Sequence, residues 1–433
     1  MNPFFLVAIP FGGVALALGG RTIQIKRLAI LSLVVEIIGL WFATGRTITW
    51  LGLPLAVSPV EHFALALTIV GIAPVLLALA DDWPGGEGMA LGLTGLAIGV
   101  FAVESGQSAV TAGAASVLAG IVLTPVLVAE NSVGAPTRAV RAFLAWAVLA
   151  GSALLVSGAL NGRYAEQPTP GVLQPATAFL VVGLGILVAA MPFSLWLPAL
   201  ADAAPGGAAV VIGLFGMAST AVLAANFGSS TWLLTAFGIR AALAGGGGVA
   251  AILCTLLAIG EKRPGRLIAL LLSANSDLAL AWTVSSSVNS LAGVIWLLEF
   301  QFLAATLALA VLASCQGKVE GLFARRPLLA LGLAIALWSL VGAPPTAGFT
   351  GRLMMAQSIL TTNVPLLLEG FVCSVLGGLA ILKLLAGLLR ERDSVIEPTT
   401  FVDVAILIVA LLVVFGGIYP NPIIAPLQAA LAG

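Results

Sequence analysis

Five residues with polar or ionisable side chains interrupt long apolar stretches of this sequence. They are Asn275, Asp277, Glu299, Arg352 and Lys383. A charged side chain is costly in apolar surroundings unless it finds a partner, and inside membranes such residues often mark a path for ions or protons. These residue types therefore predict a buried polar network that either holds segments together or carries ions.

The partners within this network are open to two interpretations. Arg352 could pair with a carboxylate on another segment, with Asp277 and Glu299 as the leading candidates, or it could bind backbone carbonyls freed at a helix break. Lys383 could extend the same network, or its long side chain could reach toward the membrane surface, since Arg390 lies about two turns further on. The sequence leaves a structural role and an ion-path role both open.

Other kinds of chemistry find little support in the sequence. The cysteines Cys254, Cys315 and Cys373 are scattered singly, without the spacing of a metal or iron–sulfur site. The single histidine, His62, follows Glu61 and suits an interfacial position. The run Gly245-Gly246-Gly247-Gly248 has no strand before it, so it favours close helix packing over phosphate binding. We expect no catalytic site, no cofactor and no metal in this chain.

The elements that position these residues are predicted to be membrane-spanning helices. Of the 433 residues, 60% are hydrophobic and 8% are charged, and the mean hydropathy is +1.15. A spanning helix needs roughly 20 mainly apolar residues, and charges, glycines and prolines divide the chain into about 14 such stretches. Their centres lie near residues 10, 36, 71, 95, 118, 150, 184, 217, 250, 275, 302, 345, 377 and 411. We therefore expect an all-α integral membrane protein.

The Lys and Arg residues are distributed unevenly among the predicted loops. The odd-numbered loops hold about 13 of the 18 basic residues, whereas the even-numbered loops hold only Arg46, Arg163 and Arg240. By the positive-inside rule the odd-numbered loops are cytoplasmic. With an even number of helices, both termini should face the non-cytoplasmic side of the cell inner (cytoplasmic) membrane.

Two of the predicted helices are discontinuous, because proline interrupts them. They cover about residues 172–205 and 328–361. The helix-break residues are Pro192, Pro198 and Pro205 in the first segment, and Pro344, Pro345 and Gly348 in the second. A proline kink alone occurs in many spanning helices. Paired breaks in corresponding halves of a chain are, however, typical of ion and solute transporters built from repeats.

The residues at both breaks resemble the patterns of a known family. Pro192-Phe193-x-x-Trp196-Leu197-Pro198, followed by Ala204-Pro205, is similar to the P-F-H-x-W-L-P-D-x(4)-A-P signature of antiporter-like membrane subunits. These subunits belong to respiratory complex I, membrane-bound hydrogenases and multi-subunit sodium/proton antiporters. The run from Gly342 to Arg352 is similar to the family's G-x-P-P-x-A-G-F-x-G-K. A weaker match leads from Arg266 to Asn275 and resembles K-R-L-x-A-Y-S-S-x-x-H/Q.

This resemblance implies 14 helices, two inverted five-helix repeats, and breaks in the seventh and twelfth helices. The expected organisation is one polytopic membrane domain over residues 1–433. Its parts are N-terminal helices at 1–85, a first repeat at 86–228, a second repeat at 240–392 and a C-terminal helix at 400–433.

The sequence departs from the family at the positions that carry protons. The family places a Glu in the fifth helix, a Lys in the seventh, a Lys or His in the eighth, and a Lys or Glu in the twelfth. The corresponding residues here are Gly120, Val188, Ser219 or Met217, and Arg352, while Ser194 and Ala199 replace the His of P-F-H and the Asp of L-P-D. Arg stays protonated in proteins and suits a proton relay poorly. The N-terminal half therefore lacks the ionisable residues of a proton path.

We thus expect a membrane subunit of a complex I-like or antiporter-like assembly, with a degenerate proton path. Its role would be structural, or that of a partial conduit for ions, protons or a small molecule. Expected partners are other membrane subunits, a cytoplasmic redox or catalytic module, and lipids, but no nucleic acid. The alternative is an autonomous secondary transporter with inverted repeats, although such carriers normally need ion-coordinating groups in both breaks.

Overall fold

The chain is described by a computed structural model. The described residues are 47–50, 53–56, 137–166, 170–229, 237–283, 288–360, 363–390, 398 and 400–432. The helices predicted near residues 10, 36, 71, 95 and 118 lie outside these ranges, as do Gly120 and His62.

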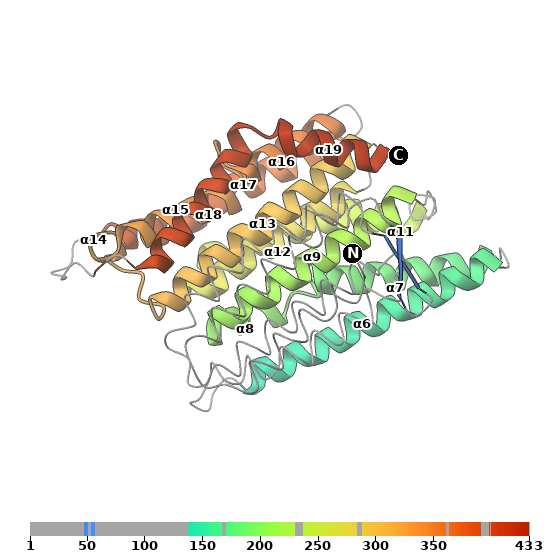
Figure 1. Cartoon of the computed structure of the whole chain (residues 1–433), viewed down its shortest axis with the longest axis horizontal. Helices are drawn as coiled ribbons and strands as arrows, with labels where there is room; N and C mark the ends of the chain where they lie inside the picture. Colours follow the sequence, from blue (N-terminus) through green and yellow to red (C-terminus); the bar gives the residue numbers. More distant parts are fainter. Residues whose placement is uncertain are drawn as a thin grey trace.

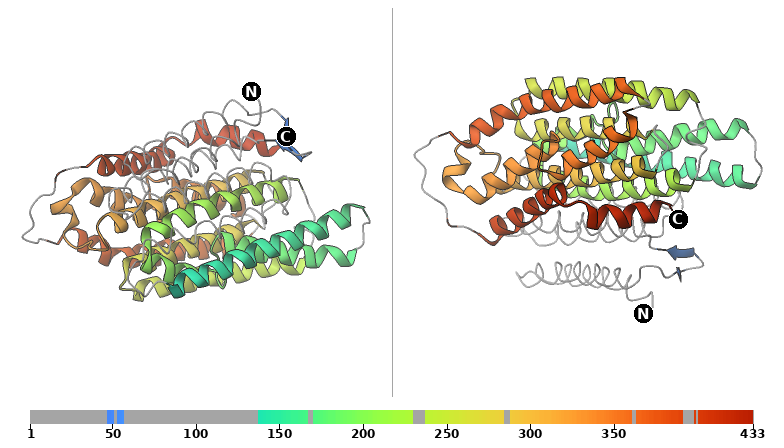
Figure 2. Two further views of the ribbon diagram at one scale, coloured as in Figure 1. Left: turned by 60° about the horizontal axis from the view of Figure 1, so that its bottom comes forward. Right: turned by 90° about the horizontal axis from the view of Figure 1, so that it is seen from above.

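The described part of the chain is a bundle of helices that run roughly along one axis (Figures 1 and 2). Its first half contains α6 (Thr137–Glu166), α7 (Pro170–Leu187), α8 (Trp196–Ala203), α9 (Pro205–Ser229) and α11 (Phe237–Gly260). Its second half contains α12 (Pro264–Trp282), α13 (Val288–Ser314), α14 (Leu322–Arg325), α15 (Pro327–Leu340), α16 (Ala347–Ile359), α17 (Val364–Leu388), α18 (Phe401–Ile418) and α19 (Asn421–Ala432). A short antiparallel hairpin of β1 (Thr47–Trp50) and β2 (Leu53–Ala56) was not predicted from the sequence.

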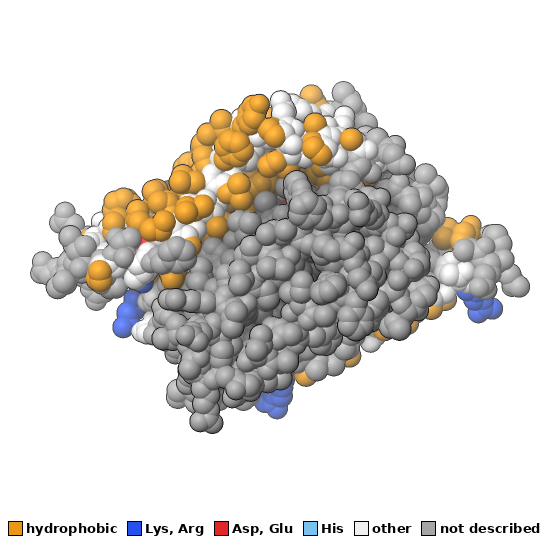
Figure 3. All heavy atoms as spheres, viewed as in Figure 1, with side chains coloured by type: hydrophobic (Ala, Val, Ile, Leu, Met, Phe, Trp, Pro, Cys, Tyr) orange, Lys and Arg blue, Asp and Glu red, His pale blue; other side chains and the backbone are white. Residues whose placement is uncertain are grey.

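Several of these helices have the length and apolar character of membrane spans. Within the described residues, four helices qualify, at Arg138–Tyr164, Ala241–Gly260, Asn289–Ser314 and Val364–Leu388. Hydrophobic side chains cover the described upper edge of the molecule over its C-terminal helices (Figure 3). This apolar surface and these spans agree with an integral membrane protein. The described helices also cover every predicted segment from residue 150 onward, with the one near 345 falling at a break.

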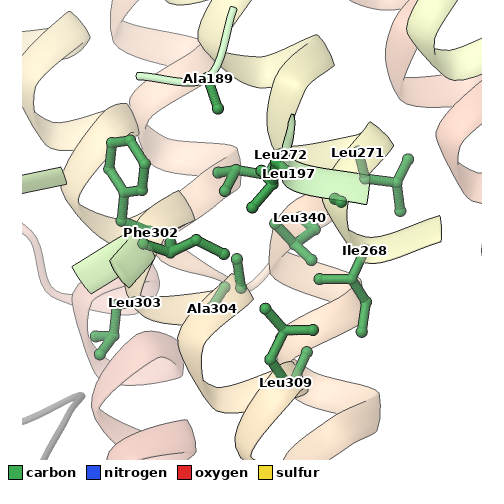
Figure 4. Packing of buried hydrophobic residues seen from close by; sticks show 14 of the residues in the cluster. Ala189, Leu197, Ile268, Leu271, Leu272, Phe302, Leu303, Ala304, Leu309 and Leu340 are labelled. Carbon is green, nitrogen blue, oxygen red and sulfur yellow. The ribbon is translucent and has the colours of Figure 1, made fainter. Parts of the chain in front are cut away.

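Helix α13 forms the centre of the bundle. Its membrane-length window is wholly buried, because α9, α12, α15 and α16 pack around it. A helix that is apolar on all sides is expected in such a central position. Ala189 and Leu340, which flank the two helix breaks, belong to one hydrophobic cluster with Leu303 and Leu309 of α13, and Figure 4 shows Leu340 in the middle of this cluster. The second break is close to the central helix, since α15 and α16 on either side of it both pack against α13.

The C-terminal segment differs from its prediction. The single helix expected at 400–433 is divided into α18 and α19, which meet at an angle of 71°. The division falls at Tyr419 and Pro420, because proline has no N–H with which to continue the helix. At its other end, α18 begins with a capping box in which Thr400 and Asp403 exchange hydrogen bonds between side chain and backbone.

Candidate functional site

The two proline breaks have the same backbone conformation. After α7 and α15 end, Ala189 and Gly342 adopt left-handed conformations, with φ of 56° and 70°. Each is followed two residues later by a cis X-Pro bond, Met191-Pro192 in one break and Pro344-Pro345 in the other. The hydrogen bonds also correspond, as seen where Ala190 N donates to Gly185 O and Ala343 N donates to Trp338 O. The chain thus builds one local structure twice.

Arg352 lies beside the second break, on α16. Its guanidinium donates to Asn275 Oδ1, to Ser374 Oγ and to the carbonyl of Leu340, which is 3.3 Å away. The residue is 8% exposed and fills the space where a side chain on Gly342 would stand. Glycine therefore suits position 342 for two reasons: it adopts the left-handed backbone conformation readily, and it has no side chain to clash with the guanidinium.

Asn275 and Gln301 complete the polar cluster at this break. Asn275 Nδ2 lies 2.8 Å from Leu340 O and 3.2 Å from Gln301 Oε1, and Gln301 Nε2 donates to Ser339 O at 2.9 Å. Carbonyls at the end of a helix have no partner within the helix. The cluster supplies donors to the last carbonyls of α15. Gln301 was missed by the sequence analysis, although a buried amide within an apolar helix is a signal of the same kind as Asn275.

Gly348 allows this cluster to form. A Cβ atom on Gly348 would lie 2.2 Å from the carbonyl oxygen of Ser339 and 2.7 Å from Gln301 Nε2. Any larger residue would push α16 away from α15. The prolines of the two breaks also have defined places. Pro192 and Pro345 follow the cis peptide bonds, and the carbonyl of Pro344 accepts a hydrogen bond from Trp338 Nε1. Pro198 lies within α8, and Pro205 is the first residue of α9.

The predicted carboxylate partners of Arg352 are not its partners in the structure. Within the described residues no ion pair involves Arg352. Glu299 is buried on α13 but does not hydrogen-bond to Arg352. Lys383 has an exposed side chain on α17, so its predicted extension of the network is wrong. The physical reason is geometric: the groups within reach of the guanidinium are neutral, namely the amide oxygen of Asn275, the hydroxyl of Ser374 and the carbonyl of Leu340.

Asp277 instead lies at the first break. Its Oδ1 atom accepts a hydrogen bond from the backbone N–H of Met191 at 2.9 Å, and Cys254 Sγ lies 3.7 Å from Oδ2. The side chain is 2% exposed. In the second break the corresponding position is Pro344, which has no N–H. The first break therefore has a backbone donor that needs a partner, and Asp277 of α12 supplies it.

The positions that lack the family's ionisable residues are apolar or weakly polar in the structure. Val188 follows α7 at the first break and is fully buried. Ser219 is buried and donates to Gly216 O at 2.6 Å, and Ser194 is buried in the turn between α7 and α8. The side chain of Met217 lies outside the described part. Among the described residues, no group of three His, Cys, Asp or Glu side chains could hold a metal ion.

Comparison with known proteins identifies related sequences. Residues 171–377 match the family model of the transmembrane region of NADH:quinone oxidoreductase and Mrp antiporters. NADH-quinone oxidoreductase subunit N 1 of Sorangium cellulosum is 29% identical over 301 residues, which cover 63% of this chain and 58% of that protein. The chain thus spans about three-fifths of the length of this curated relative.

Solved structures share the fold. A chain of respiratory complex I from Thermus thermophilus, with bound aureothin, has a TM-score of 0.79 and 19% identity, and the match covers 98% of this chain and 99% of that one. A chain of the Mrp complex from Dietzia sp. has a TM-score of 0.79 and 18% identity, over 99% of this chain and 52% of that chain. At these identities the likeness concerns the fold.

Proposed function

We propose that the chain is a member of the antiporter-like family of membrane subunits and that it serves in a larger, complex I-like or antiporter-like membrane assembly. Its role there is structural, or that of a partial conduit. Redox cofactors and catalytic chemistry belong to partner subunits, which include other membrane proteins and a cytoplasmic module.

The buried valine at the first break is the observation that carries this proposal. Val188 stands where the family has a lysine, and a proton relay needs groups whose pKa can be moved near ambient pH. The sequence has no Lys, Arg or His between Arg163 and Arg240. The interval holds two acidic residues: Glu166, at the C-terminal end of α6, and Asp202, which pairs with Arg263 and Arg266. The absence of a basic residue at these positions supports a degenerate proton path in the N-terminal half.

Matched breaks support two repeats. The equal backbone conformations at Ala189 and Gly342 are expected if each half contains the same unit of five helices. We include in the proposal the full count of 14 helices and the placement of both termini outside the cytoplasm. The second half differs from the first in keeping Arg352, a fixed charge whose guanidinium binds the helix break.

Gentle purification of the tagged protein tests the assembly. We expect at least one other membrane protein to co-purify in constant stoichiometry. A single, stable species that transports ions alone in liposomes would contradict the proposal and favour an autonomous transporter with inverted repeats.

Proton transfer through the N-terminal half can be tested in the same assembly. Replacing Ser194 or Asp202 with Ala should leave the activity of the complex within about threefold, or about 0.7 kcal/mol. A larger loss from Ser194→Ala, with assembly intact, would contradict the degenerate path.

A further inference from the structure

A cavity of about 510 Å³ lies beside the first helix break, between α7, α11 and α12. Its walls are mainly small or apolar residues. They include Gly185, Ala190, Phe193, Gly246, Ala250 and Leu280. This volume lies within the range of roughly 300–1,000 Å³ that is usual for small-molecule sites. The cavity is therefore large enough for an organic ligand.

Asp277 is the one charged residue among the described residues that line this cavity. Among the described residues, its carboxylate accepts one backbone N–H on Oδ1, and Oδ2 has only the thiol of Cys254, 3.7 Å away. An ionised carboxylate can accept about four hydrogen bonds, and a thiol is a weak donor. Within the part of the chain that the structure describes, no Lys, Arg or His lines the cavity. The carboxylate thus retains capacity for a strong, positively charged donor.

The apolar walls restrict what that donor can be. A metal ion such as Ca²⁺ or Mg²⁺ binds through about six oxygen ligands, and these walls offer one carboxylate among aliphatic and aromatic groups. A molecule with one ammonium group and an apolar body matches both features. Its ammonium would pair with Asp277, which leaves no net charge in the cavity, and its body would fill the apolar space.

The rim of the cavity indicates how a ligand would enter. Ala178 on α7, and Ala242 and Gly246 on α11, are exposed. The same helix α11 exposes the apolar side chains of Val249 and Leu253, as a membrane-facing helix does. We propose that this cavity binds a small lipophilic amine, which enters laterally from the bilayer and pairs with Asp277. This inference does not rest on the proposed function.

Equilibrium binding to the full chain, with any co-purifying partners, tests the site in lipid nanodiscs. The probes are phenylbutylamine, protonated at neutral pH, and phenylbutanol, its neutral counterpart of similar shape. We expect the amine to bind at least about tenfold more tightly than the alcohol. Asp277→Asn should reduce amine binding to the level of the alcohol, because the amide keeps an acceptor for Met191 N–H but has no charge.

A second variant tests the cavity without altering the carboxylate. A Cβ on Gly246 would meet no atom within 4 Å, so Gly246→Leu can fold and place its side chain into the cavity. It should weaken both probes. Equal binding of amine and alcohol to the unaltered protein would overturn the proposal, as would unchanged amine binding in either variant. Displacement of the amine by sodium, but not by choline at the same ionic strength, would also overturn it in favour of an inorganic cation.

Discussion

Asp277 Oδ1 and Met191 N are joined by a hydrogen bond of 2.9 Å, which ties α12 to the helix break of the other half of the chain. The two breaks have the same backbone conformation, but only the first has an N–H at this position, because Pro344 takes its place in the second. The two breaks differ at this one position, and the Asp277 carboxylate binds the break that has the free N–H.

Asp277 variants should separate hydrogen bonding from charge. We expect Asp277→Asn to change the free energy of unfolding by less than about 1 kcal/mol, since the amide oxygen can still accept from Met191 N–H. Asp277→Leu should cost about 1–3 kcal/mol more, because it strands this buried donor. Thermal denaturation in detergent measures the difference. Equal stability of the two variants would mean that the Met191 bond contributes nothing.

Substitutions of Arg352 should show the cost of a buried charge without a counter-ion. Arg352→Met removes the charge together with its hydrogen bonds, whereas Arg352→Lys keeps the charge but cannot reach both Asn275 and Ser374. We expect the lysine variant to be the less stable of the two by about 1–2 kcal/mol. Ser194→Ala is the control, with a change below about 1 kcal/mol. Wild-type stability of Arg352→Lys would contradict this account.

The ion pair of Arg326 with Asp403 should matter more than that of Arg263 with Asp202. Arg326 and Asp403 have side chains that are 13% and 2% exposed, and their pair joins the start of α15 to the first turn of α18. Arg326→Ala leaves a buried carboxylate and should cost about 3–5 kcal/mol. Arg263→Ala breaks a pair that is 60% and 21% exposed, and should cost at most about 1 kcal/mol. Denaturation midpoints of the two variants compare them directly, and similar losses would refute the ranking.

Replacement by alanine should destabilise the protein at Gly265 but not at Gly245. A Cβ on Gly265 would lie 2.3 Å from Ala201 O of α8, whereas one on Gly245 would meet nothing within 4 Å. Gly265→Ala should force α8 and α12 apart at a cost of about 1–3 kcal/mol. Gly245→Ala should be neutral or stabilise by up to about 1 kcal/mol, because alanine favours the helix. A stable Gly265→Ala protein would show that α12 can shift without loss.

Membrane orientation can be checked with reporter fusions. The loop after α17 carries Arg390 and Arg392, so the positive-inside rule places it in the cytoplasm. A reporter that is active only in the cytoplasm should work when inserted near Arg392 and be silent when fused after Gly433. The reverse pattern would mean that the predicted helix count is wrong by one.

The sequence alone determined the membrane character, the positions of the helices from residue 150 onward and both breaks. These features depend on local causes: apolar stretches of a fixed length, and prolines that remove a backbone donor. Composition and motif were enough to find them. The sequence also predicted that Arg352 is buried next to the second break, because this residue directly follows Gly348-Phe349-Thr350-Gly351 within an apolar helix.

Only the tertiary structure decided which polar groups meet. Asp277 and Asn275 are two residues apart on one helix, so they point to different sides of it: Asn275 contacts Arg352 at the second break, and Asp277 contacts Met191 at the first. Lys383 faces outward on α17 for a similar reason of helix rotation. Sequence spacing gives the face of a helix but not the neighbour that packs against it, since that neighbour is fixed by how all the helices fill space around α13.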